Sequence, residues 1–235
     1  MAERTTSEPV LTLAIETSNP SSGGEPGVAL GMTSAESCDV LGVEPLGSGE
    51  RHDDLLMPAI DRLFTCLGHK PHEVRRIVVS VGPGGYTGLR IATSAANLIA
   101  LSTGADVVAV PSAAVVARAI TGRGPLVVCL ASKHASAWVT RFDAQGRITD
   151  AGSLRTADEL GLSGEETLVG DRFLPETFRK AAERVGSRVA EPEFDPAACL
   201  ALAWAFPARQ AGEVAPLYGR EAEAVTRWRE LHGSG

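Results

Sequence analysis

The sequence predicts an α/β fold built from two copies of one β-β-β-α-β-α unit. Short apolar runs bounded by Gly, Pro and Ser alternate with longer segments in which apolar residues recur at helical spacing. The order of these segments in residues 1–110 returns, more faintly, in residues 111–235. We therefore expect an N-terminal half, 1–110, and a C-terminal half, 111–235, in contact along their edge.

The first half begins with three predicted strands that form a meander: Val10 to Thr17, Gly27 to Met32 and Cys38 to Val43. A helix from about His52 to Leu67 follows, because its apolar residues lie on one stripe. A strand at Ile77 to Val81 leads through a glycine-rich loop into a helix from Leu89 to Ser102. A strand at Val107 to Val110 ends the first half, and a helix that begins near Ser112 follows it.

The second half repeats this order with three further predicted strands: Leu126 to Leu130, Ala137 to Phe142 and Ile148 to Leu154. A helix near Ala157 and a strand at Leu168 to Val169 are predicted next. Two more helices, Glu176 to Val185 and Pro196 to Gln210, end the unit.

The glycine-rich loop is the strongest motif of the chain. Gly82 to Arg90 reads Gly-Pro-Gly-Gly-Tyr-Thr-Gly-Leu-Arg, with four glycines and one proline in seven positions between a strand and a helix. Free N–H groups at a helix N-terminus favour anions, so one interpretation is a phosphate site. The other is a tight turn that packs against a neighbouring element. No Gly-Lys-Ser/Thr follows, and the spacing is one residue too long for a dinucleotide fingerprint, so the glycines alone leave both interpretations open.

The composition limits the classes of function. A net charge of −7 argues against a chain that binds nucleic acid unaided, since phosphate contacts need clustered Lys and Arg. The four cysteines are far apart and form no Cys-x-x-Cys pair, which indicates reduced thiols in a cytosolic protein. No apolar run reaches the length of a membrane span, so we expect a cytoplasmic location.

Four segments carry a family resemblance. Leu13 to Ser18 reads Leu-Ala-Ile-Glu-Thr-Ser, and Arg51-His52 precedes a helix that contains Pro58-Ala59-Ile60. The loop string continues to Ile91, and Pro216 to Arg220 reads Pro-Leu-Tyr-Gly-Arg. In the same order, these segments resemble signatures of the TsaB (YeaZ) family, the partner subunit in bacterial tRNA threonylcarbamoyladenosine synthesis. The matches are dense over roughly the first 110 residues and sparse afterwards.

The repeated unit suggests, and the resemblance implies, the actin-like ATPase fold, a ribonuclease-H-like unit used twice (the ASKHA architecture). Ligands of that fold lie between the halves, where a carboxylate in each first turn helps to hold metal and phosphate. Glu16 could supply one carboxylate, but the counterpart turn has Ala131 where the family has Asp, which argues against autonomous phosphoryl transfer. The candidate nucleotide-binding residues are Glu16, Thr17, Ser18, Gly84, Gly85 and Thr87. For Glu16 we prefer the alternative of a solvated strand end.

Catalytic residues and a metal site are not expected. The related TsaD/Kae1 family holds a metal with a His-x-x-x-His pair, whereas the corresponding stretch here, Val110 to Val116, contains no histidine. His69 and His72 flank a proline in a predicted loop, which favours solvated side chains over metal ligands. His134 has no evident acid or nucleophile partner.

The helix from Leu89 to Ser102 is apolar nearly all round, which indicates burial on more than one side. It could be a core helix covered by the His52 helix, or it could meet a partner. The resemblance favours a partner, because TsaB proteins bind TsaD through these two helices and self-associate through the same face when TsaD is absent. The residues expected at this interface are Leu55, Leu56, Ala59, Ile60, Leu63, Leu89, Ala92, Ala95, Ala96 and Ile99.

The resemblance therefore implies a non-catalytic subunit that binds and activates TsaD for threonylcarbamoyl transfer to the adenosine beside the tRNA anticodon. The ATPase TsaE would join the complex, tRNA would be reached only through it, and ATP would act at the level of the complex rather than as a cofactor of this chain. Two alternatives stay open: a stand-alone ATP-binding phosphotransferase of the actin-like fold, and a homodimeric binding module outside the tRNA pathway. Two departures from the family pattern keep the second alternative open: Ala131 replaces the family's Asp, and Ser136 stands where the family tends to have Glu.

Overall fold

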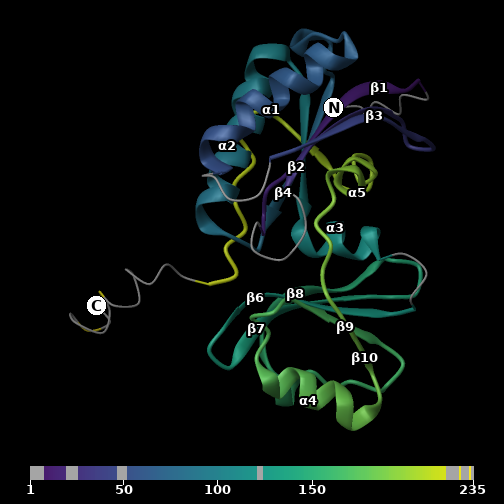
Figure 1. Cartoon of the computed structure of the whole chain (residues 1–235), viewed down its shortest axis with the longest axis vertical. Helices are drawn as coiled ribbons and strands as arrows, with labels where there is room; N and C mark the ends of the chain where they lie inside the picture. Colours follow the sequence, from purple (N-terminus) through teal and green to yellow (C-terminus); the bar gives the residue numbers. More distant parts are fainter. Residues whose placement is uncertain are drawn as a thin grey trace.

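The computed structural model describes residues 8–19, 26–46, 52–120, 124–220, 228 and 233. Two β-sheets form the body of the molecule, and helices lie outside and between them (Figure 1). The predicted α/β class is confirmed.

The first sheet has the strand order β11-β5-β4-β1-β2-β3. Its strands are β1 (Val10–Glu16), β2 (Gly27–Thr33), β3 (Cys38–Pro45), β4 (Arg76–Gly82), β5 (Asp106–Pro111) and β11 (Ala208–Arg209). The meander β1-β2-β3 is antiparallel, whereas β4 and β5 run parallel to β1. The short β11 adds an antiparallel edge beside β5.

The second sheet has the order β10-β9-β6-β7-β8. Its strands are β6 (Leu126–Lys133), β7 (Ser136–Phe142), β8 (Ile148–Thr156), β9 (Thr167–Gly170) and β10 (Arg188–Ala190). An antiparallel meander, β6-β7-β8, again precedes two parallel strands on the other side of its first strand. The two sheets thus share one topology, as the repeated order of segments predicts.

The helices occupy three layers (Figure 1). They are α1 (His52–Leu67), α2 (Tyr86–Thr103), α3 (Ser112–Ala119), α4 (Glu176–Val185) and α5 (Pro196–Leu200), with 3₁₀ turns at Pro71–Glu73 and Ala157–Glu159. Helices α1 and α2 cover one face of the first sheet, α3 and α5 lie between the sheets, and α4 covers the outer face of the second. The helix expected near Ala157 is only the second of these 3₁₀ turns.

The central strands are buried on both faces, so alternate residues enter different cores. Leu13 and Ile15 of β1 pack under α1 and α2, whereas Ala14 faces the core between the sheets. In β6, Val128 faces that same central core and Val127 packs against α4. Strands that are covered on both faces are near-continuous apolar runs. Such a run indicates a buried strand, but it does not show which residues face which core.

The last part of the chain returns to the first sheet. We expected a helix from Pro196 to Gln210 inside a second half of residues 111–235. Instead α5 ends at Leu200, contacts β1 and β2, and leads through turns to β11 in the first sheet. The physical reason lies at Arg76, whose guanidinium packs 3.5 Å from the centre of the Trp204 ring and donates to the Ala203 carbonyl oxygen at 2.9 Å.

Beyond β11 the chain lies against both halves. The backbone N–H of Leu217 donates to the carbonyl oxygen of Val81 at 2.7 Å, and Asn97 Nδ2 donates to the carbonyl oxygen of Val214 at 2.8 Å. Arg220 then reaches the turn between β6 and β7 in the second half. Residues 208–220 therefore join the two halves.

In the part of the chain that the structure describes, no helix is both long enough and apolar enough to cross a lipid bilayer.

Candidate functional site

The glycine loop joins β4 to α2 at the side of the first sheet that faces the second. Gly82 has φ 110, in the region that favours glycine, and a Cβ there would lie 2.5 Å from the carbonyl oxygen of Leu217. Gly85 is the N-cap of α2, with φ −63. The conformational need for glycine is thus at the first position of the loop and not at Gly85.

The turn after β1 packs directly into this loop. The backbone N–H of Gly85 donates to the carbonyl oxygen of Ser18 at 2.6 Å, and a Cβ on Gly84 would lie 2.1 Å from the same oxygen. The Thr17 hydroxyl donates to the carbonyl oxygen of Gly88 at 3.2 Å. Of the six candidate nucleotide-binding residues, the structure brings five together, but they contact one another. Thr87 is exposed on the first turn of α2.

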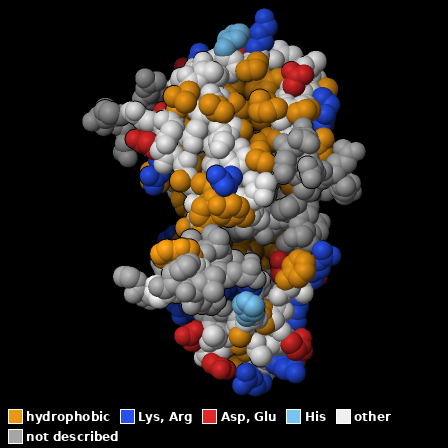
Figure 2. Space-filling model, turned by 90° about the vertical axis from the view of Figure 1, so that its left-hand side faces the viewer, with side chains coloured by type: hydrophobic (Ala, Val, Ile, Leu, Met, Phe, Trp, Pro, Cys, Tyr) orange, Lys and Arg blue, Asp and Glu red, His pale blue; other side chains and the backbone are white. Residues whose placement is uncertain are grey.

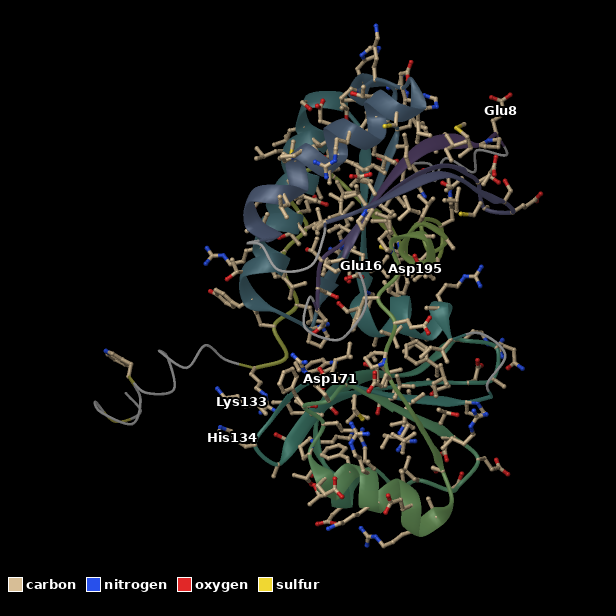
Figure 3. The ribbon with its side chains drawn as sticks, in the orientation of Figure 1. Glu8, Glu16, Lys133, His134, Asp171 and Asp195 are labelled. Carbon is tan, nitrogen blue, oxygen red and sulfur yellow. The ribbon has the colours of Figure 1, made fainter. Side chains whose placement is uncertain are left out.

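Glu16, at the end of β1, is fully buried, so the preference for a solvated strand end is wrong. Its Oε1 accepts hydrogen bonds from the backbone N–H of Ser18 at 2.7 Å and from the Ser18 hydroxyl at 2.6 Å, whereas Oε2 has no partner among the described residues. Asp195, the N-cap of α5, lies near it (Figure 3). Burial raises the pKa of Glu16, although the hydrogen bonds from Ser18 oppose this shift.

The surroundings of Glu16 are buried and polar. Ser80 of β4 and Ser112 of α3 share a hydrogen bond of 2.8 Å between their hydroxyl oxygens. Cys199 of α5 lies with its Sγ 3.9 Å from the carbonyl oxygen of Ile15, and burial raises the pKa of its thiol.

Replacement of Glu16 by glutamine is expected to change the pH dependence of stability. Because the pKa of Glu16 is raised in the folded chain, the wild type loses free energy of unfolding as the pH rises above the ordinary value of 4.5, and the loss is complete above the raised pKa. Glu16→Gln keeps the acceptor oxygen for Ser18 and removes this loss. Urea unfolding between about pH 4 and pH 9 should show the variant gaining on the wild type with rising pH.

Glu36→Gln, which removes one carboxylate from an exposed turn, is the control for that measurement. A constant difference between Glu16→Gln and the wild type across the pH range would contradict a raised pKa at Glu16.

The counterpart turn, at the end of β6, has a strained backbone. Ala131 has φ 49 and His134 has φ 55, both in the left-handed region that non-glycine residues seldom adopt. Nη2 of Arg220 donates to the carbonyl oxygens of Ser136 at 2.7 Å and Lys133 at 3.2 Å, and to the Ser136 hydroxyl at 2.9 Å. The turn is therefore held by the C-terminal segment, and Figure 3 shows Lys133 and His134 at its tip.

Replacement of Ala131 by glycine is expected to raise the free energy of unfolding by about 0.5–1 kcal/mol, because the relief of left-handed strain exceeds the extra entropy of glycine in the unfolded chain. Thermal and urea unfolding measure the change. Ala144→Gly, at an exposed position outside the left-handed region, should lower stability instead. Equal destabilisation by both glycines would show that Ala131 is unstrained.

An exposed aromatic pair stands beside the glycine loop. The chain has two tyrosines, and their rings stack with centroids 4.8 Å apart. Tyr86 begins α2 and Tyr218 belongs to the C-terminal segment, so the stack fixes that segment to the helix. The guanidinium of Arg90 lies over the Tyr86 ring, with Cζ 5.3 Å from the ring centre. The Pro-Leu-Tyr-Gly-Arg string, which carries part of the family resemblance, contains both Tyr218 and Arg220. The sequence predicted no contact for either residue.

The helices α1 and α2 present both buried and exposed apolar residues. Seven of the ten residues expected at a partner interface are buried in the chain's own core: Leu56, Ala59, Ile60, Leu63, Leu89, Ala92 and Ala96. Leu55, Ala95 and Ile99 are half-buried at the edge of that core. These seven side chains are therefore not available to a partner, because the chain's own core already covers them. The expectation that all ten form the interface is corrected in this respect.

The outer face of the two helices carries other apolar residues. Met57 of α1 is 55% exposed, and Leu98 and Leu101 of α2 are each 65% exposed. Figure 2 shows hydrophobic side chains spread over the upper half of the face where α1 and α2 lie. Sequence periodicity could not separate these residues from the buried ones, because α2 is apolar on nearly every side.

Within the described ranges, no three His, Cys, Asp or Glu side chains are grouped so that they could hold a metal ion. His69 pairs through Nδ1 with Oε2 of Glu73 at 2.9 Å, and the side chain of His52 lies outside the described residues. All four cysteines are free.

Comparisons with known proteins identify one matching family model and one similar curated protein. The family model described as "TsaD: tRNA N6-adenosine threonylcarbamoyltransferase" matches residues 33–188. The chain is 32% identical over 100 residues to the tRNA threonylcarbamoyladenosine biosynthesis protein TsaB of Bacillus subtilis (strain 168), a match that covers 43% of this chain and 40% of the relative. The match thus spans about two fifths of the length of that curated relative.

Two solved structures share the fold. YeaZ from Pseudomonas aeruginosa has a TM-score of 0.67 and 18% identity, over 89% of this chain and 99% of that one. A protein with similarity to peptidase YEAZ from Pseudomonas aeruginosa has a TM-score of 0.65 and 19% identity, over 90% of this chain and 100% of that one. Both likenesses concern the actin-like, ribonuclease-H-like architecture as a whole.

Proposed function

The chain belongs to the family that the TsaD model describes. We propose that within this family it is a TsaB (YeaZ) protein, a non-catalytic subunit that binds a TsaD protein in tRNA threonylcarbamoyladenosine synthesis. In this role it activates TsaD, which transfers the threonylcarbamoyl group to the adenosine beside the anticodon. The name of the Bacillus subtilis relative supports the pathway, and the chain's own surface supports the binding role.

The observation that carries this proposal is the exposed apolar face of α1 and α2. Three large apolar side chains, Met57, Leu98 and Leu101, are more than half exposed there. Half-buried Leu55, Ala95 and Ile99 lie between this surface and the core, and the small Ala95 lets another backbone approach closely. Several large apolar side chains exposed on one pair of helices are typical of a protein interface. We propose TsaD as its occupant, with a second copy of the chain in its place when TsaD is absent.

The self-contained glycine loop supports the non-catalytic part of the proposal. A phosphate site at this loop would need free N–H groups at the start of α2 and open space beside the glycines. Here the N–H group of Gly85 already donates a hydrogen bond to the carbonyl oxygen of Ser18, and the Ser18 backbone fills the space beside Gly84. We propose that ATP acts at the level of the complex, through TsaE, and that tRNA is reached only through TsaD.

Co-expression with TsaD of the same organism tests the proposal. The chain should elute with TsaD in one complex on gel filtration. With TsaD, TsaE and threonylcarbamoyl-AMP present, it should support tRNA modification that TsaD performs poorly without it. The chain alone should neither modify tRNA nor hydrolyse ATP.

Two results would overturn the proposal. ATP hydrolysis that scales with the purified chain and survives repurification would favour a phosphotransferase. A stable homodimer that neither binds TsaD nor stimulates it would favour a binding module outside the tRNA pathway.

A further inference from the structure

A cavity of about 640 Å³ opens between the two halves, away from the glycine loop. Its walls come from α3, from the start of β6, from the turn between β7 and β8, and from the segment that follows α5. Because the segment after α5 leads back to the first sheet, the walls come from parts of the chain that belong to both sheets. Ligand pockets in proteins commonly have volumes of about 300–1,000 Å³ and often lie at such junctions.

The interior of the cavity is apolar. The wall from α3 consists of small side chains, Ala114 and Ala117, and the opposing walls carry large ones: Leu126, Phe142, Ile148, Leu202 and Phe206. The alanines create the space, because a larger residue on α3 would fill it. Ile148, Leu202 and Phe206 are only partly buried, so the chain leaves apolar surface uncovered there.

The rim of the cavity is cationic. Arg118, on the last turn of α3, is exposed and lines the cavity, and among the described residues it forms no hydrogen bond or ion pair. Arg147 lines it from the β7–β8 turn, and its Nε donates to Oδ2 of Asp143 at 2.8 Å. Asp143 thus pairs with Arg147, and Arg118 is left without a carboxylate partner among the described residues.

We propose that this cavity binds a small amphipathic anion, a free carboxylate with an unbranched apolar chain, whose chain lies against Phe142, Leu202 and Phe206 and whose carboxylate pairs with Arg118. The apolar walls account for the chain, because burial removes both surfaces from water. The guanidinium accounts for the head group, because a charge-assisted hydrogen bond to a carboxylate is stronger than a neutral one. A bound ligand would bridge α3 and the second sheet, so it would also stiffen the junction of the two halves.

Titration calorimetry of the full chain with decanoate, kept below its micelle concentration, tests the proposal. We expect saturable binding at one site. Arg118→Gln should weaken that binding about tenfold, because it removes the charged partner from an exposed position that the fold does not need. Ala205→Trp, at an exposed position on the wall, should weaken it more than tenfold by filling the cavity.

Arg184→Gln is the matched control, since it removes an exposed arginine from the last turn of α4 and should change the affinity less than twofold. Circular dichroism and thermal unfolding establish that each variant is folded. Should Ala205→Trp not fold, the comparison of Arg118→Gln with Arg184→Gln decides alone. Absence of saturable binding, or equal affinities for Arg118→Gln and Arg184→Gln, would overturn the proposal. Neither result depends on whether the chain binds TsaD.

Discussion

Replacement of Gly84 by alanine should lower the free energy of unfolding by about 2–4 kcal/mol, because the new Cβ would lie 2.1 Å from the carbonyl oxygen of Ser18. That oxygen is backbone and accepts the N–H of Gly85, so it cannot withdraw without breaking the hydrogen bond that joins the first turn to the loop. The conflict must therefore shift either β1 or the start of α2. Urea unfolding with tryptophan fluorescence measures the loss.

Gly42→Ala provides the comparison. A Cβ at Gly42 would meet only the ends of the Leu63 and Leu67 side chains, at 3.1 to 3.4 Å, and these can rotate away. We expect a change of less than about 1 kcal/mol there. A stable Gly84→Ala variant that instead gains or loses affinity for a nucleotide would show that the loop is a ligand cradle.

The sequence allows the architecture to be predicted because its strands and helices carry strong local signals. Buried strands such as β4 are continuous apolar runs between polar turns, and α4 has its full extent, Glu176–Val185, marked by helical spacing and a terminating glycine. The repeat of these signals in one order predicts the two sheets of equal topology. Local signals of this kind do not depend on distant contacts.

Two predictions are wrong, and in both places contacts between residues far apart in the sequence decide the structure. The segment after Leu200 is rich in alanine, and its apolar spacing predicts helix to Gln210, but Trp204 instead packs on Arg76 and donates from Nε1 to the Thr33 hydroxyl at 3.0 Å. The preference for Glu16 as a solvated strand end is likewise wrong. The burial of Glu16 depends on Ser18 and on the cover given by α5, and no pattern near β1 announces either contact.

At the glycine loop, the sequence predicts where the glycines lie but not what they contact. Five of the six candidate nucleotide-binding residues lie together and contact one another. The backbone of residues 17–19 fills the space between them, with the Asn19 amide Nδ2 3.4 Å from the carbonyl oxygen of Pro83. Glycine is thus required for close packing of two chain segments, and the same residue type at the same spacing would serve a ligand equally well. Only the contact partner distinguishes the two cases.

Replacement of Leu98 by aspartate should weaken binding to TsaD at least 100-fold, or abolish self-association, and leave the chain folded. Leu98 is 65% exposed on α2, so the free chain keeps the new carboxylate in water. At the centre of an apolar interface the same carboxylate would lose its hydration without a partner, at a cost of several kcal/mol.

Leu154→Asp, at a 42% exposed position on β8, is the matched control and should leave binding unchanged, because it lies in the second sheet, far along the fold from α1 and α2. Ala96→Asp, at a fully buried position on α2, should instead unfold the chain. Gel filtration and calorimetry with TsaD measure binding, and circular dichroism measures folding. Because Leu98 and Ala96 lie on one helix and present different faces, the three variants separate the core of α2 from its partner surface. A folded Leu98→Asp chain that binds TsaD as the wild type does would place the interface away from these helices.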